Sequence, residues 1–598
     1  MEWMKPIAST EIPVGDEWIY EVKYDGFRCK LIWSVANKIT LISKNKHNIT
    51  KKFPEIIQWC ENNYEFFKTA LPLEFDGELV ILNHRYQANF AQIQIRGRLQ
   101  STDRIEKKAN LRPATLMVFD LTKLKGKKLY QSNLSLRKKY LDQLMQDIRG
   151  DGRIRCVESF TSVSKINEIV YAAKSEGVVA KRKKSIYQKG KQHQSWFKIK
   201  NWRLIHGILT AYNPSNGYFT VSVLENNQPV HIGKCKHGLE KDASQTVQKL
   251  FQEQGEFKDG IYYLPPAITS TIHTLDLYDE ELREPEFKHI TSSIAYSECT
   301  LDKLQLDMAQ LPHSIDISNT DKYLWPNNYT KQDLLVYIRE ISPWMLPFLR
   351  QKALTIIRCP DGITKESFFQ KNLPDYAPDF LSSTSAQENY IVCNHLRSIV
   401  WLANHGSIEY HIPFQRIGHV TPLEIVFDLD PPDREHFKLA VHAANLLKHI
   451  LDELELVSFV KTSGNKGLQV YIPIREGSMT YDETFLFTEA IAKTLEKSYP
   501  NDFTTERMKK NRHNRLYIDY VQHGKDKTLI APYSPRMTKE GTVSTPLYWN
   551  EVNNELDPTH FTIGNVINRV REIGCPFANY HDMHEQQPMK KMLRLVRG

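Results

Sequence analysis

A lysine near the start of the chain has the surroundings of a nucleophile. Lys23 ends a short apolar run and precedes Tyr24, Asp25 and Gly26 in the stretch IYEVKYDGFRCK (19–30). A neutral lysine amine can attack a phosphorus centre and form a covalent intermediate. A solvated surface turn would have the same composition, so this stretch alone leaves both interpretations open.

Segments downstream of Lys23 carry charged residues within or beside short strands. Together with the lysine stretch, they resemble in order the motifs of the covalent nucleotidyltransferases, which are the ATP-dependent DNA ligases, RNA ligases and mRNA capping enzymes. The resemblance covers about 200 residues and implies that Lys23 takes AMP from ATP. The segments are LEFDGELV (73–80), FDLTKLKG (119–126), EGVVAKR (176–182) and SWFKIK (195–200).

Such a lysine must lose its proton before it attacks the α-phosphate. We expect neighbouring cations, namely Arg28, Lys198, Lys200 and a divalent metal, to lower the pKa of Lys23. Lys198 and Lys200 stand at i and i+2 of one strand, so both side chains lie on the same face. There they could stabilise the leaving pyrophosphate.

Two glutamates could hold the metal. Glu78 and Glu176 end or follow strands and offer hard oxygen ligands for Mg²⁺ or Mn²⁺. A solvated strand end is the alternative for each. The resemblance further implies that Phe119 stacks on the adenine, that Glu21 lies near the adenine edge and that Arg28 touches the ribose or a phosphate.

Two segments bear on how the phosphates are held. The family's Ser-Arg-Asn-Gly reads Ser-Lys-Asn-Lys over residues 43–46, so Lys44 keeps the charge of the arginine without its bidentate fork. LREPEFKHI (282–290) resembles the closing motif of ligases, in which Arg283 and Lys288 would contact the triphosphate. A plain basic loop is the alternative.

A group of aspartates in the second half of the chain suggests a second chemistry. The apolar strand in EIVFDLDPPD (424–433) ends with Asp428 and Asp430 at i and i+2, which places both carboxylates on one strand face. Asp519 could supply a third carboxylate. Two divalent ions held there could activate a 3′ hydroxyl and stabilise a leaving pyrophosphate. A loop at a strand end is the alternative for an isolated Asp-x-Asp.

Other residues around these aspartates suit a triphosphate. Backbone amides in the turn of TSGNKGLQVYIP (462–473) and several side chains could bind it. These side chains are Ser463, Lys466, Lys527, Ser534 and Arg536.

These segments resemble the polymerase domain of bacterial DNA ligase D, in the archaeal and eukaryotic primase superfamily, over roughly residues 312–598. The resemblance implies that Phe368 and Phe369 stack on the template end; two core aromatics are the alternative. The family has a histidine that contacts the triphosphate where this chain has Gln469. Glutamine can donate a hydrogen bond but carries no charge, so we expect weaker nucleotide binding or a lower rate.

Composition and element patterns predict a multidomain α+β protein. An adenylation domain of the covalent nucleotidyltransferase fold is expected at 1–204, an OB-fold β-barrel at 205–295, a linker at 296–311 and a primase-superfamily α+β polymerase domain at 312–598. The net charge of +9 fits a polyanionic partner. The eight cysteines form no Cys-x-x-Cys, and no apolar run could span a bilayer. We therefore expect no membrane association and a cytoplasmic location, and the resemblance implies a bacterial, nucleoid-associated one.

The combination resembles the ligase-polymerase of bacterial non-homologous end joining, with the ligase first. Only 22 residues precede Lys23 and there is no cysteine-rich finger, which favours ATP over NAD; the fused polymerase argues against a capping enzyme. The resemblance implies sealing of nicks through lysyl-AMP, filling of short gaps with NTP or dNTP at double-strand ends, and Ku as partner. We expect no 3′-phosphoesterase domain and a role for KRKK (181–184) in DNA retention.

Two alternatives stay open. One is a DNA-end-binding scaffold with a weakened polymerase site, which the departures at Lys44, Lys46 and Gln469 suggest. The other is a nick-repair ligase that works without Ku.

Overall fold

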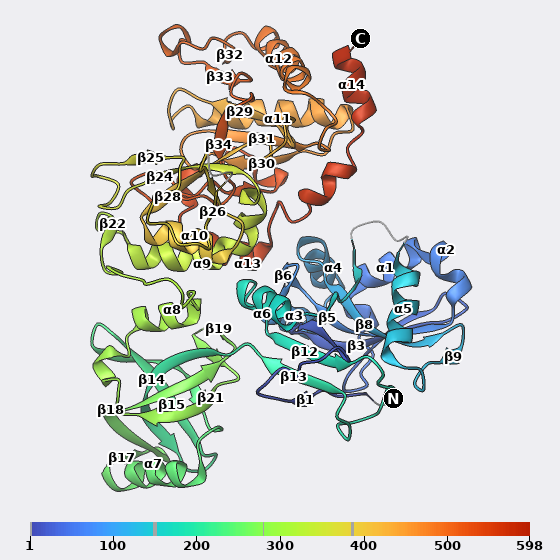
Figure 1. The fold of residues 1–598 in the computed structure, drawn as a ribbon, viewed down its shortest axis with the longest axis vertical. Coiled ribbons are helices and arrows are strands. Elements are labelled where there is room, and N and C mark those ends of the chain that lie inside the picture. The colour runs from blue at the N-terminus through green and yellow to red at the C-terminus, as the bar shows by residue number, and fades with distance from the viewer. Residues whose placement is uncertain (1–2, 147–151, 279, 384–387, 598) are drawn as a thin grey trace. The chain divides into compact units, whose positions relative to one another are not determined.

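The computed structural model describes all residues except 1–2, 147–151, 279, 384–387 and 598 (Figure 1). The chain divides into two compact units, Met1–Gln310 and Leu311–Gly598. Among the described residues, none of the helices combines the length and apolar character needed to cross a membrane.

Two sheets build the N-terminal part of the first unit. Their strand orders are β1-β13-β12-β2-β11 and β10-β8-β5-β3-β4, with β9 paired to β8. The first sheet contains β1 (Ile7–Ala8), β2 (Trp18–Lys23), β11 (Ser159–Phe160), β12 (Gly177–Arg182) and β13 (Trp196–Lys200). The second contains β3 (Phe27–Trp33), β4 (Ile39–Ser43), β5 (Leu73–Val80), β8 (Thr115–Leu124), β9 (Lys127–Lys128) and β10 (Ile154–Cys156).

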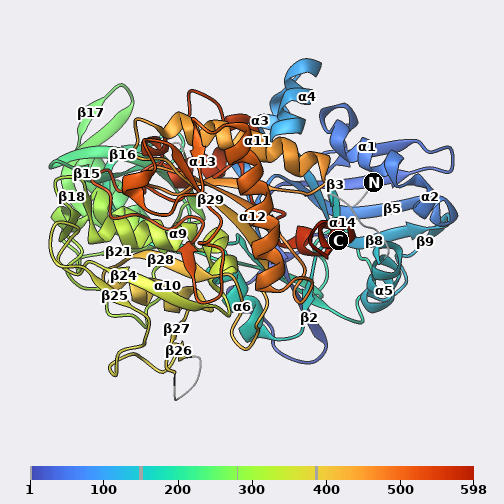
Figure 2. The ribbon, with the colours of Figure 1, turned by 90° about the horizontal axis from the view of Figure 1, so that it is seen from above.

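Alternation along these strands separates the core from the site. Val22 of β2 and its register partner Val178 of β12 pack in a buried apolar cluster. Lys23 follows Val22 in β2 and therefore projects from the opposite face. Helix α5 lies beside β8 (Figure 2). The helices and the small hairpin of this part are α1 (Pro54–Asn62), α2 (Tyr64–Phe67), β6 (Leu82–His84), β7 (Gln87–Ala88), α3 (Phe90–Arg98), α4 (Thr102–Leu111), α5 (Leu134–Met145) and α6 (Val163–Ala172).

An antiparallel sheet follows, ordered β16-β15-β14-β18-β17 with β21 paired to β18. Its elements are β14 (Arg203–Asn213), β15 (Tyr218–Glu225), β16 (Gln228–Cys235), α7 (Lys241–Gln254), β17 (Glu256–Lys258), β18 (Ile261–Thr274), β19 (Asp276–Tyr278), β20 (Glu281–Arg283) and β21 (Glu286–Thr291). The division between the two units, after Gln310, falls inside the range 296–311 predicted as a linker, but most of this range is helical. Helix α8 (Leu301–Ala309) lies there, and it buries Leu304 and Met308 in the core of this sheet.

The second unit also contains two sheets, ordered β26-β27-β24-β28-β34 with β25 paired to β24, and β32-β33-β29-β31-β30-β35. The first contains β24 (Ala353–Arg358), β25 (Phe368–Gln370), β26 (Ser382–Ser383), β27 (Ile391–Val392), β28 (Ser407–Pro413) and β34 (Thr528–Ile530). The second contains β29 (Glu424–Asp430), β30 (Phe459–Thr462), β31 (Leu468–Pro473), β32 (Phe503–Thr504), β33 (Leu516–Asp519) and β35 (Pro546–Leu547).

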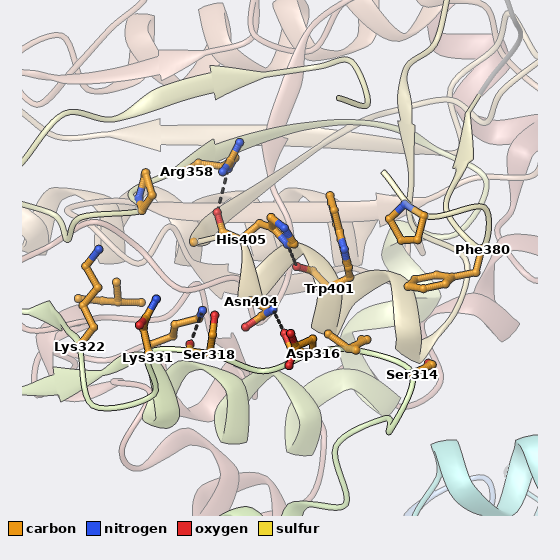
Figure 3. Close-up of a pocket in the computed structure, with 16 residues that line it drawn as sticks. Ser314, Asp316, Ser318, Lys322, Lys331, Arg358, Phe380, Trp401, Asn404 and His405 are labelled. Carbon is orange, nitrogen blue, oxygen red and sulfur yellow. Dashed lines mark hydrogen bonds between the residues drawn. The ribbon is translucent and has the colours of Figure 1, made fainter. Parts of the chain in front are cut away.

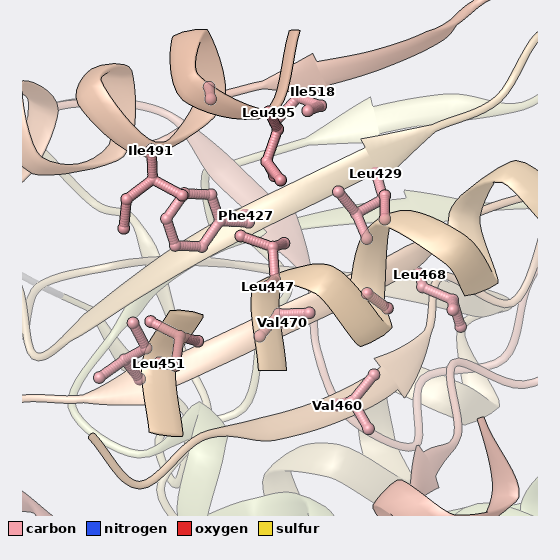
Figure 4. Close-up of a cluster of buried hydrophobic side chains, with 14 of the residues drawn as sticks. Phe427, Leu429, Leu447, Leu451, Val460, Leu468, Val470, Ile491, Leu495 and Ile518 are labelled. Atoms are coloured by element: carbon pink, nitrogen blue, oxygen red, sulfur yellow. The ribbon is translucent and has the colours of Figure 1, made fainter. Parts of the chain in front are cut away.

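One face of the second sheet is covered by helices. Phe427 and Leu429 of β29 point toward Leu447 of α11 and Leu495 of α12 (Figure 4). Helix α11 (Phe437–Glu453) buries its apolar face, including Phe437, Val441, Ala444, Leu447 and Leu451. The remaining elements of this unit are β22 (Tyr323–Trp325), β23 (Tyr329–Thr330), α9 (Lys331–Leu349), α10 (Leu396–Asn404), α11 (Phe437–Glu453), α12 (Tyr481–Ser498), α13 (Val566–Ile573) and α14 (Met589–Arg597).

Candidate active sites

Lys23 belongs to a row of residues that crosses three strands. It is in register with Gly177 of β12, and Gly177 is in register with Lys200 of β13. Gly177 has φ of +156°, and a Cβ there would lie 2.1 Å from the carbonyl oxygen of Ile199. A residue without a side chain is therefore needed for β13 to lie this close to β12 beside Lys23.

Carboxylates surround the Lys23 ammonium. Its Nζ lies 2.5 Å from Glu176 Oε1. Burial lowers the pKa of Lys23, but the charges of Glu176, Asp25 and Glu78 raise it, and the result is a pKa above the ordinary value. For the protein alone, the predicted lowering of this pKa is wrong, because the charged partners that dominate are acids and not cations.

The same acids suit a divalent cation. Burial raises the pKa of Glu78 to about 8, against the opposing charges of Lys23 and Arg28. Burial and the charge of Glu176 raise the pKa of Asp25 to about 7. Among the described residues, the buried Glu176 Oε2 has no hydrogen-bond partner. A cation held by Glu78 and Glu176 would satisfy that oxygen and reduce the repulsion between the carboxylates.

Phe119 lies between two cations at the side of this site. Its ring centroid is 4.4 Å from Lys181 Nζ and 5.2 Å from the guanidinium carbon of Arg28. Lys181 forms an ion pair with Glu21 at 2.5 Å, and Lys138 forms a second ion pair with Glu21. Sequence reasoning missed this network. It assigned Lys181 to the DNA-binding KRKK run, but Lys181 is only 2% exposed and points into the protein.

Arg28 and Lys44, the predicted ribose or phosphate contacts, differ in how freely they could reach a nucleotide. Arg28 Nη2 donates to Asp76 Oδ2 at 2.8 Å and its side chain is 10% exposed, so an internal partner already uses part of its fork. Lys44 is exposed. Lys46, where the family has glycine, adopts φ of +66°. The loop thus keeps a glycine-like conformation at a cost of about 1 kcal/mol.

The closing motif reaches the loop that follows Lys23. Arg283 Nη2 donates to Asp25 Oδ1 at 2.8 Å, and Lys200 Nζ lies 2.8 Å from Glu284. Burial lowers the pKa of Lys198, and the charges of Lys23 and Lys200 lower it further. Of the cations predicted to contact the triphosphate, Arg283, Lys198 and Lys200 therefore lie near Lys23, and Arg283 and Lys200 are paired with acids, whereas Lys288 is exposed.

A second row of polar residues crosses the sheet of the second unit. Lys461 of β30 is in register with Gln469 of β31, Gln469 with Asp428 of β29, and Asp428 with Asp519 of β33. Their strand neighbours are buried in the core shown in Figure 4, so alternation directs these four side chains to the opposite face.

The predicted aspartate triad is only partly assembled. Asp428 and Asp519 lie opposite each other, but Asp430 is 2.9 Å from Lys466 Nζ and 3.0 Å from Arg512 Nη1. In the described part of the chain, no three His, Cys, Asp or Glu side chains form a ready metal site. Burial raises the pKa of Asp428 to about 6, and the charges of Asp519 and Asp430 add to this. A divalent cation would relieve this repulsion.

A cavity of about 220 Å³ lies over Asp428 and Asp430. Of the predicted triphosphate ligands, those that line it are Ser463, Lys466, Gln469 and Arg536. Ser534 does not: it is fully buried, and its hydroxyl accepts from the Tyr410 amide and donates to Pro535 O. The predicted contact of Ser534 with the triphosphate is therefore wrong, because its hydroxyl is used to bond two backbone segments. Lys527 is exposed and lies outside the residues that line the cavity.

Sequence reasoning missed His411, which lines this cavity and whose Nε2 lies 2.9 Å from Glu409. The available signal was its position in the alternating strand β28, where it follows Glu409 at i+2. Phe368 and Phe369 are 43% and 77% exposed on β25. They are therefore not the core aromatics of the alternative interpretation.

A larger cavity, of about 520 Å³, was not predicted (Figure 3). Three cations line it: Lys322, Lys331 and Arg358. Lys331 is 7% exposed and donates to Ser318 O at 2.7 Å. Burial lowers its pKa, and the charge of Lys322 lowers it further. An anion in the cavity would offset both effects.

Comparison with known proteins gives the class of each half. The model of the ATP dependent DNA ligase domain matches residues 5–200, and that of the LigD primase-polymerase domain matches residues 330–577. The protein is thus an ATP-dependent DNA ligase domain joined to a primase-polymerase domain.

The chain is 38% identical to the bifunctional non-homologous end joining protein LigD of Bacillus subtilis over 605 residues, which covers 99% of each chain. It belongs to the LigD family of non-homologous end joining proteins. A LigD of Pseudomonas aeruginosa is 23% identical over all of this chain and 74% of its own length. The polymerase domain of Mycobacterium tuberculosis Ligase D, solved with DNA, covers 46% of this chain and 99% of its own at 27% identity and a TM-score of 0.42.

Proposed function

We propose that this protein repairs DNA double-strand breaks with Ku, by filling short gaps in its polymerase domain and sealing the nick through a lysyl-AMP intermediate in its ligase domain. The observation that carries the proposal is the position of Lys23 beside Glu176 and close enough to Glu78 to feel its charge, together with the ring of Phe119 against Arg28 and Lys181. The cluster offers one amine, metal-ligating carboxylates and an aromatic surface for adenine.

The ligase steps follow from this arrangement. The Lys23 amine, once deprotonated, attacks the α-phosphorus, a P–N bond forms and the bond to pyrophosphate breaks. Lys198 and Lys200 stabilise the departing charge. AMP then passes to the 5′-phosphate at the nick, and the 3′ hydroxyl displaces it as the phosphodiester forms. A divalent metal held by Glu78 and Glu176 would neutralise phosphate charge and favour loss of the Lys23 proton.

The polymerase steps use the second row. Asp428, Asp519 and Asp430 would hold Mg²⁺ or Mn²⁺, which supplies activation of the 3′ hydroxyl. Ser463, Lys466 and Arg536 would bind the triphosphate of an NTP or dNTP. Phe368 and Phe369, exposed on β25, would stack on bases at the template end.

The cavity of Figure 3 fits a terminal phosphate of DNA, because Lys322, Lys331 and Arg358 line it and Lys331 has a backbone oxygen, not a carboxylate, as its hydrogen-bond partner. We expect Lys331→Ala to weaken binding of a duplex with a recessed 5′-phosphate about tenfold, and binding of the same duplex with a 5′-hydroxyl less than about twofold. Fluorescence anisotropy at fixed salt measures both. Lys438→Ala, an exposed lysine of α11, is the control. Equal losses on both duplexes would contradict the assignment.

End joining tests the proposal as a whole. With linear duplexes whose ends need one added nucleotide, the Ku homodimer is expected to raise the yield of joined product at least about tenfold, because tethering raises the effective concentration of ends. Gel analysis of labelled duplexes gives the yield. Sealing that is indifferent to Ku would favour the nick-repair ligase, and DNA binding without any lysyl adenylate would favour the scaffold.

A further inference from the structure

Lys461 is a fully buried lysine beside the polymerase site that none of the steps above uses. Its Nζ lies 2.5 Å from Gln469 Oε1 and 2.6 Å from Ser544 Oγ. Lys461 must be the donor in both contacts. An amide oxygen only accepts, and the Ser544 hydroxyl already donates its proton to Thr462 O at 3.0 Å. The direction of these bonds therefore holds whether or not the amine is charged.

This contact decides which end of the Gln469 amide faces the cavity. Because Oε1 accepts from Lys461, Nε2 lies on the other side, where it donates to Asp428 Oδ1 at 3.0 Å. The NH₂ group has two hydrogens and Asp428 takes one. Gln469 also lines the cavity of about 220 Å³, so the second hydrogen is available to a group bound there.

The sheet keeps this arrangement in place. Lys461, Gln469 and Asp428 are register partners on three adjacent strands, and the residues beside them in sequence are core residues of the helix-covered face. None of the three can turn to the other face without a slip of its strand. The chain of contacts from amine to amide to carboxylate is thus built into the register.

We propose that Lys461 is a positioning residue that makes Gln469 a fixed hydrogen-bond donor to the phosphates of the incoming nucleotide. The proposal rests on the polymerase function proposed above. A free glutamine amide can present either oxygen or nitrogen, and its oxygen would repel a triphosphate. Lys461 excludes that orientation, which explains how this chain functions with glutamine where its family has histidine.

The test is the effect of Lys461→Met on nucleotide binding. This variant keeps the length of the side chain and removes the donor, so the KM for UTP in gap filling is expected to rise about tenfold, with a smaller change in kcat. A role in folding alone would reduce the active fraction and hence kcat, and would leave KM unchanged. Ser544→Ala, which removes another contact of Lys461 but leaves Gln469 intact, is the control and should keep KM within about twofold.

A second substitution makes the test specific. Gln469→His supplies an imidazole that needs no amide orientation, so adding Lys461→Met to it should change KM by less than about threefold. An unchanged KM in Lys461→Met, or the same rise in both backgrounds, would overturn the proposal. Binding of UTP measured by calorimetry gives the same comparison without turnover. The binding measurement therefore separates the two proposals. If UTP binds but the wild-type chain adds no nucleotide, the polymerase proposal fails, and the role of Lys461 in binding is still tested.

Discussion

Lys23→Met is expected to abolish formation of the covalent adenylate and to reduce nick sealing about a thousandfold or more. The variant lacks the amine that attacks ATP, and the thioether of methionine cannot replace it as a nucleophile. Incubation with α-labelled ATP, acid precipitation and gel electrophoresis measure the adenylate directly. Sealing of a nick whose 5′ end already carries AMP should survive better, since that step does not need the Lys23 amine as nucleophile.

Lys181→Met is the matched control, because Lys181 is a lysine of the same sheet that likewise pairs with a glutamate. It should still form the adenylate, with a weaker affinity for ATP. A chain that is labelled equally well with and without Lys23 would show that the nucleophile has been misassigned.

Asp428→Ala is expected to reduce nucleotide addition about a thousandfold, with adenylate formation at Lys23 unchanged. The substitution removes the carboxylate at the centre of the row and with it the oxygens that would bind the metal. Extension of a gapped duplex with labelled nucleotide measures the first activity and labelled ATP the second.

Asp433→Ala provides the comparison, because Asp433 follows the same strand but is 54% exposed by side chain and pairs only locally with His436. It should leave both activities within about twofold. Gap filling that persists in Asp428→Ala, or a parallel loss of adenylation, would argue against the aspartates as metal ligands and against separate active sites.

The sequence was most informative where strand alternation decides the outcome. The pattern of EIVFDLD places Phe427 in the core and Asp428 in the site, as the structure does. In α11 the apolar residues recur at helical spacing, and these are the residues that the helix buries. Such local rules need only the identity of neighbours along the chain.

What the sequence did not reveal depends on pairing between distant segments. The ion pairs of Glu21 with Lys138 and Lys181 join residues more than a hundred positions apart, and the pKa of Lys23 is set by Glu176, 153 positions away. Helix α8 was read as a linker because its apolar face is short and finds its partner in an earlier sheet. The cavity at Lys331 likewise combines residues of α9, α10 and β24 with loop residues, and these segments share no motif.

The register row from Lys461 to Asp519 also limits how this gene can change. Loss or gain of a single codon within β29 or β31 would exchange the two faces of the strand, turn Phe427 toward the nucleotide and bury an aspartate among leucines. Point substitutions at the four positions alter only the contacts of one side chain, whereas a one-residue deletion would alter all contacts of its strand together. Variation among descendants of this chain should therefore be dominated by replacements in these strands, with changes of length confined to the loops between them.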